Sequence, residues 1–117
     1  MAPQGPYKLV TVNNAPERAK IIVGRVIEAL KDEYTIEYAA NAESPEAAKA
    51  VFEKIMPDVV FTASMWTPEQ SSKVLDQARE VNPKVKTLAL PQGLQVAKGP
   101  DGVVDYIKEQ LPALIDS

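Results

Sequence analysis

The stretch PDVVFTASMW, residues 57–66, decides the fold. Its apolar run at 59–61 ends in small and polar residues at 62–64, and Met65 and Trp66 follow. A short apolar run bounded by a proline and by small residues is typical of a strand buried on both faces, as in a parallel sheet. The carboxyl end of such a strand is where α/β sheets usually bind ligands, so residues 62–64 mark the expected site.

Four stretches with helical periodicity surround this strand, and each opens with a proline followed by an acid. Proline suits the first helical turn because its missing N–H would have no partner there, and the acid meets the positive end of the helix dipole. Asn14 with Glu17, and Thr67 with Gln70, also have the spacing of a capping box. The four starts are APE at 15–17, SPE at 44–46, TPE at 67–69 and GPD at 99–101.

Short β-type runs alternate with these helices, which predicts a parallel sheet joined by right-handed crossovers. The expected fold class is α/β: a three-layer αβα sandwich around a doubly wound parallel sheet of four to five strands. Apolar runs suit central strands at 8–12 and 58–62, whereas Glu37 places the run at 34–39 at an edge. The runs are KLVTV (8–12), YTIEYA (34–39), DVVFT (58–62), VKTLAL (85–90) and, as a weaker candidate for a fifth strand, LQVA (94–97).

The chain has 117 residues, which predicts one domain over residues 8–117 after a flexible tail at 1–7. The helices fill this length, so we expect no separate output domain. The start, MAPQGPYK, lacks the basic and apolar regions of a signal peptide, and no apolar run approaches the roughly 20 residues that span a bilayer. We therefore expect no membrane partner and a cytoplasmic location.

Charge and composition exclude several classes of function. The net charge of -3 and the pI near 5.0 predict no nucleic-acid partner, because such binding needs clustered Lys and Arg. The chain contains neither Cys nor His. Disulfides, thiolate nucleophiles, imidazole bases and the usual zinc sites are therefore excluded.

Three segments resemble the receiver domain of response regulators (the CheY-like superfamily, with a flavodoxin-like fold). The resemblance covers nearly the whole chain and implies the strand order 2-1-3-4-5. Because PQGLQV leaves only a few residues after the fourth strand, it also implies one helix fewer than a standard receiver. The three segments are LVTVNNAPE (9–17), KIMPDVVFTASMWTP (54–68) and VAKGPDGVVDYIKEQL (96–111).

Carried over residue by residue, the receiver's charged site is nearly absent. The paired acids that hold Mg²⁺ in the family fall on Asn13 and Asn14. The phosphoacceptor aspartate falls on Ala63 when counted forward from Pro57, or on Ser64 when counted back from the proline at 68. Since neutral amides do not compensate the charge of Mg²⁺, and neither Ala nor Ser is a carboxylate nucleophile, the resemblance implies no metal, no cofactor and no receiver phosphorylation.

Polar residues at the strand ends could instead bind a polar or monoanionic metabolite. Against this, Asn14 could cap the first helix and Asn13 could satisfy loop backbone. Lys98, the match for the receiver's lysine, could be a solvated charge near Asp101 or the base of a Ser–Lys pair with Ser64. The candidate ligand-binding residues are Asn13, Asn14, Thr62, Ser64, Gln92 and Lys98.

A neutral, partly apolar patch forms the candidate interaction surface: Met65, Trp66, Pro91 and Leu94. A solvent-facing Trp66 would suit a recognition anchor, and the alternative is a side chain folded back over the core. Loss of a helix would expose the fourth-strand side of the sheet, which favours a homodimer or another protein partner.

These observations favour a non-enzymatic, receiver-like interaction, signalling or scaffold module that has lost Mg-dependent phosphorylation and has no catalytic residues. The alternative is a small-molecule binding protein or small enzyme that uses the polar residues at the strand ends.

Overall fold

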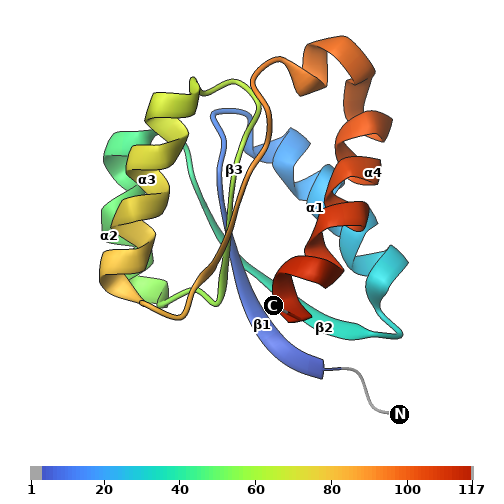
Figure 1. Ribbon diagram of the computed structural model, residues 1–117, viewed down its shortest axis with the longest axis horizontal. Helices are drawn as coiled ribbons and strands as arrows, with labels where there is room; N and C mark the ends of the chain where they lie inside the picture. The colour runs from blue at the N-terminus through green and yellow to red at the C-terminus, as the bar shows by residue number, and fades with distance from the viewer. Residues whose placement is uncertain (1–3, 117) are drawn as a thin grey trace.

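A parallel sheet in the order β2-β1-β3-β4 forms the centre of the computed structural model, which describes residues 4–116 (Figure 1). Helices α1 and α4 cover one face of the sheet, and α2 and α3 cover the other. This arrangement confirms the predicted three-layer α/β fold. The elements are β1 (Gln4–Val12), α1 (Pro16–Leu30), β2 (Tyr34–Ala42), α2 (Pro45–Ile55), β3 (Val59–Thr62), α3 (Pro68–Val81), β4 (Lys86–Ala89) and α4 (Leu94–Asp116).

Strand alternation builds a separate core on each face of the sheet. Leu9 and Phe61 point toward α1 and α4, whereas Val10, Val12 and Val60 point toward α2 and α3. All five side chains are buried. The central position of β1 and β3 and the edge position of β2 are therefore as predicted.

The N-terminal segment corrects the predicted flexible tail. Strand β1 begins at Gln4, which is in register with Tyr34 of β2, so residues 4–7 belong to the sheet. The ring of Tyr7 lies 6.4 Å from that of Tyr34, centroid to centroid, and this aromatic contact holds the strand against β2. Residues 1–3 of the predicted tail lie outside the described residues.

Three of the four proline starts begin helices as predicted, at Pro16, Pro45 and Pro68, and the fourth, Pro100, begins the second helical segment of α4 after the non-helical Gly99. The capping box of Thr67 and Gln70 is present, with both reciprocal hydrogen bonds. The predicted cap at Asn14 is wrong, because Ala15 occupies the N-cap of α1 and no side chain caps this helix.

The predicted fifth strand at 94–97 is also wrong. Leu94 begins α4, and the N–H of Ala97 donates to the carbonyl of Gly93 at 2.9 Å. The helix has a sharp kink at Gly99, whose φ of 68° favours glycine. Four strands and four helices are thus present in residues 4–116, one helix fewer than a standard receiver, as expected. Among the helices described, none is both long enough and apolar enough to span a bilayer.

Candidate functional site

The carboxyl ends of β1 and β3 lie side by side, with Val12 in register with Thr62. The carbonyl of Val12 accepts two hydrogen bonds from the loop after β3: one from the N–H of Ala63 at 3.1 Å and one from the indole Nε1 of Trp66 at 2.7 Å. A carbonyl oxygen has two lone pairs, so both bonds are satisfied together. The loop after β3 is therefore fixed on the end of β1.

Asn13 is buried, and its polar groups serve the backbone and side chains around it. Its Oδ1 accepts from the N–H of Ala15 at 2.7 Å, and its own N–H donates to the carbonyl of Ala42 at 2.9 Å. The Nδ2 of Asn41 donates to its carbonyl at 3.0 Å. The structure thus supports the interpretation that Asn13 satisfies hydrogen-bonding groups of the loop backbone.

Asn14 is exposed, and its N–H approaches the sulfur of Met65 at 3.4 Å. This contact joins the loop after β1 to the loop after β3, so the two loops hold each other at the strand ends. The side chain of Asn14 faces solvent next to this junction.

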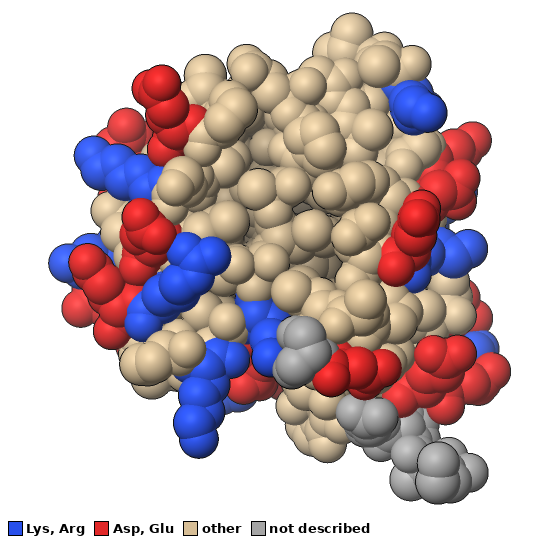
Figure 2. Space-filling model, viewed as in Figure 1, with Lys and Arg blue, Asp and Glu red and all other residues tan. Residues whose placement is uncertain are grey.

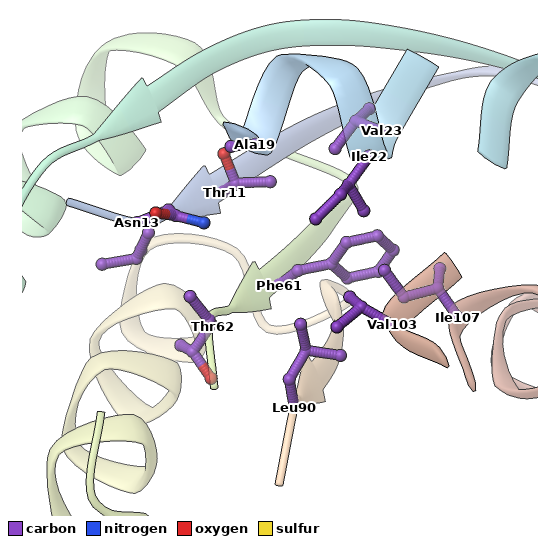
Figure 3. Close-up of a pocket in the computed structure, with 12 residues that line it drawn as sticks. Thr11, Asn13, Ala19, Ile22, Val23, Phe61, Thr62, Leu90, Val103 and Ile107 are labelled. Carbon is purple, nitrogen blue, oxygen red and sulfur yellow. The ribbon is translucent and has the colours of Figure 1, made fainter. Parts of the chain in front are cut away.

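Thr62, Ala63 and Ser64 are all buried. The hydroxyl of Thr62 has no hydrogen-bond partner among the residues described, and it points away from Phe61 (Figure 3). Ala63 directly follows the last residue of β3, which is the position of the receiver's phosphoacceptor when counted from the preceding proline. Its methyl group offers no ligand atom.

Ser64 binds the segment that leads into α4. Its Oγ accepts from the N–H of Gln95 at 3.2 Å, and its carbonyl accepts from the N–H of Gly93 at 2.9 Å. The hydroxyl of Ser64 is therefore held by a backbone amide and has no side-chain base as a partner among the residues described.

Lys98 and Gln92 are exposed. Lys98 precedes the kink of α4, and the carbons of its side chain lie against Gly102. Within residues 4–116, Lys98 takes part in no ion pair, and Asp101 pairs instead with Arg25 at 2.8 Å. The structure does not join Lys98 to Ser64, so no Ser–Lys pair is formed.

A cavity of about 30 Å³ lies between the strand ends and helices α1 and α4 (Figure 3). Apolar side chains from β1, α1, β3 and α4 line it, among them Ile22, Phe61 and Val103. A space of this size holds a water molecule or two, whereas metabolite pockets measure roughly 300–1,000 Å³. The cavity is therefore part of the core and not a metabolite pocket.

The residues at the strand ends do not fit Mg²⁺. Mg²⁺ binds carboxylate oxygens and water in an octahedron, whereas Asn13 has its amide oxygen engaged and Ala63 has none. No cluster of three acidic, His or Cys side chains suited to a metal ion occurs in the described part of the chain. No step through a metal ion is available at these residues.

The candidate interaction residues surround the junction of these loops. Trp66 and Met65 are half-buried, and Trp66 packs against the core that α2 and α3 form with the sheet, as the folded-back alternative predicts. Pro91 is exposed and Leu94 is half-buried. All four lie near the strand ends, but Trp66 covers the core and does not stand free.

A polar chain next to the site was not predicted. Thr11 donates to the Oδ1 of Asn41 at 2.6 Å, so the 2.6 Å contact between Thr11 and Tyr38 has the Tyr38 hydroxyl as its donor. The only sequence signal is a threonine within an apolar strand, whose partner in register is Asn41, while Tyr38 lies opposite Leu9. These hydrogen-bonded side chains link β1 to β2 and, through Asn41, to Asn13.

Comparison of the sequence with models of protein families and with curated proteins finds no match. Solved structures do match. PhyR from Brucella abortus has a TM-score of 0.56 at 18% identity, over 99% of this chain and 55% of that one. A mutant of the anti-anti-sigma factor PhyR from Bartonella quintana has a TM-score of 0.51 at 12% identity, over 92% of this chain and 51% of that one. A receiver-domain protein from Clostridium thermocellum has a TM-score of 0.51 at 12% identity, over 92% of this chain and 98% of that one.

This chain spans about half the length of both PhyR chains and nearly all of the clostridial domain. At such low identities the likeness concerns the fold. The order β2-β1-β3-β4 with helices on both faces agrees with it. The chain therefore has the fold of a response-regulator receiver domain.

Proposed function

We propose that this chain is a non-enzymatic, receiver-like signalling or scaffold module that has lost Mg-dependent phosphorylation and acts by binding protein. The observation that carries the proposal is the neutral strand-end site. Asn13 uses its amide oxygen to bind the loop backbone, and the residue that matches the phosphoacceptor is Ala63 when counted from Pro57 or Ser64 when counted from the proline at 68, neither of them a carboxylate. Without a carboxylate, the metal has no charged ligand and the acyl phosphate has no nucleophile from which to form.

The open edge of β4 supports the binding part of the proposal. The amides of Lys86 and Leu90 donate to β3, so the alternation of a parallel strand turns the amides of Thr87 and Ala89 outward. The segment from β4 to α4 crosses the front of the sheet in Figure 1, and the same face in Figure 2 has a broad centre without charged side chains. An edge with outward amides is suited to pairing with an extended segment of a partner, with charge from Lys86 and from the Arg79 side chain that bonds Thr87 at its start.

Signalling by protein contact also agrees with one structural relative. The Bartonella quintana protein is named an anti-anti-sigma factor. For this chain, a cytoplasmic protein partner is part of the proposal.

The small-molecule alternative has one observation in its favour, the buried hydroxyl of Thr62 without a partner among the residues described. A bound polar atom would satisfy it. The neighbouring cavity of about 30 Å³ admits water but not a metabolite, and Gln92 and Lys98 lie on the surface. A protein-binding function therefore has the stronger support.

Incubation with Mg²⁺ and acetyl phosphate tests the proposal. We expect the intact mass of the wild-type chain to stay unchanged. The matched variant Asn13→Asp/Asn14→Asp/Ala63→Asp places carboxylates at the three positions that match the receiver's acids. Once circular dichroism has established that this variant is folded, we expect it to gain a phosphoryl group. An acid-labile phosphoryl group on the wild-type chain would show that the proposal is wrong.

A further inference from the structure

Gly24 lies in the middle of α1 on its outward face. A glycine inside a helix destabilises it by about 1 kcal/mol relative to alanine. At this position a Cβ atom would have nothing within 4 Å, so no packing within the chain requires the glycine. A glycine without a use in its own chain permits another backbone to approach the helix closely.

The surface around Gly24 is hollowed and partly apolar. A shallow groove runs between α1 and α4, and Ile21 stands at its side with 63% of its surface exposed. Few large apolar side chains are this exposed in the described part of the chain. The groove is lined by Glu17, Lys20, Ile21, Gly24, Arg25, Glu28, Ala29, Val104 and Lys108.

Four exposed charges on this face are arranged antisymmetrically about Gly24, whereas two further cations that line the groove, Arg25 and Lys108, have no counterpart in this pattern, and Arg25 pairs with Asp101. Lys20 and Glu28 lie four residues before and after it, and Glu17 and Lys31 lie seven residues before and after it. All four are exposed, and Lys31 continues the helical geometry at the C-cap. Positions four and seven residues apart share one helix face, so each charge has its opposite at the same distance on the other side of the glycine.

We propose that two copies of this chain associate through α1, antiparallel, about a two-fold axis at Gly24. In that arrangement Lys20 faces Glu28 of the partner subunit, and Glu17 faces Lys31 of the partner subunit. The same register places Ile21 against Ile27 of the partner subunit and brings the two glycines together at the crossing. A parallel arrangement would set each charge against its own copy and would be repelled.

Contacts already present in the chain are compatible with this dimer. The pair of Lys31 and Glu28 at 2.8 Å is exposed on both sides and contributes little by itself, so its two charges remain available to a partner. A contact centred on one helix buries less than the roughly 1,600 Å² of a standard interface, so a weak, reversible dimer is expected. The inference goes beyond the proposed function, because it concerns α1 and depends neither on the strand ends nor on β4.

Sedimentation equilibrium of the purified chain, from about 10 μM to about 1 mM, covers the affinity range expected of so small an interface. We expect a concentration-dependent monomer–dimer equilibrium. Lys20→Glu should weaken it about tenfold or more, because it turns two attractive pairs of the symmetric dimer into repulsive ones. Lys20→Glu/Glu28→Lys restores opposite charges across the axis and should return Kd to within about threefold of the wild type.

Two further variants separate association from folding. Gly24→Leu should abolish the dimer without lowering the urea midpoint, because leucine favours the helix but prevents the close approach. The matched double reversal on α2, Lys49→Glu/Glu53→Lys, should leave Kd unchanged. A chain that stays monomeric at the highest concentration, a Gly24→Leu variant that dimerises as well as the wild type, or a charge reversal that is not rescued by the double variant would each overturn the proposal.

Discussion

Trp66 and Asn13 show how single residues hold the strand ends together through hydrogen bonds. The indole of Trp66 reaches a carbonyl 54 residues earlier in the chain, and Asn13 binds a backbone amide only two residues later. The local role of Asn13 could be inferred from the sequence, because asparagine commonly binds backbone nearby. The bond of Trp66 could not, because its partner is brought to it only by the pairing of β1 with β3.

Tyr38 gives a prediction on pH. Burial raises the pKa of its phenol, because the charged phenolate loses solvation there. The unfolded phenol loses its proton near pH 10 and the folded one at higher pH, so its contribution to stability is complete below about pH 10 and falls as the pH rises. As the pH rises into the alkaline range, the free energy of unfolding of Tyr38→Phe should therefore fall less than that of the wild type.

Urea midpoints measured from about pH 8 to about pH 11 check this prediction. The pKa of Tyr34 is also raised, first by burial and then by its hydrogen bond with Asp116, so the variant should keep part of the alkaline slope. Equal slopes for the variant and the wild type would show that Tyr38 does not contribute.

At the scale of elements, the helix starts were largely predictable and the segment after β4 was not. Proline and an acid determine a helix start locally, so Pro45 and Pro68 could be identified without the fold. The conformation of LQVA depends on whether a strand can pair there. The segment follows β4 so closely that its amides donate to the carbonyls of Pro91 and Gly93. An apolar run that resembles a strand therefore forms a helix.

Removing the side-chain cap of α3 should destabilise the protein, whereas removing the side chain of Asn14 should not. Thr67→Ala deletes the acceptor for the N–H of Gln70 and is expected to cost about 1 kcal/mol of unfolding free energy. Asn14→Ala is the matched control and should stay within about 0.5 kcal/mol of the wild type, because Asn14 makes no cap. Urea unfolding compares the two, and an equal loss in both would contradict the assignment of the caps.

At the scale of the whole molecule, one sheet joins the two cores. Neighbouring residues of β1, Leu9 and Val10, belong to opposite cores, so neither core can open without disturbing the strand that it shares with the other. The chain is therefore expected to unfold in a single cooperative step, as small domains usually do.

Phe52→Ala tests this coupling. Phe52 is fully buried between α2 and the sheet, and its truncation should cost about 3–5 kcal/mol. Fluorescence of Trp66, which reports on the same core, and circular dichroism, which reports on all helices, should give one common midpoint. Glu53→Ala, an exposed neighbour, should change stability by less than about 0.5 kcal/mol. Two separate midpoints would show that the cores unfold independently.

The backbone amides of Gly93 and Gln95 both donate hydrogen bonds to Ser64, and these bonds have a consequence for the proposed function. They fasten the loop after β3 to the start of α4, so neither segment can rearrange without breaking both bonds. Under the function proposed above, occupancy of a protein partner would follow mass action, and the abundance of the chain would set how much complex forms.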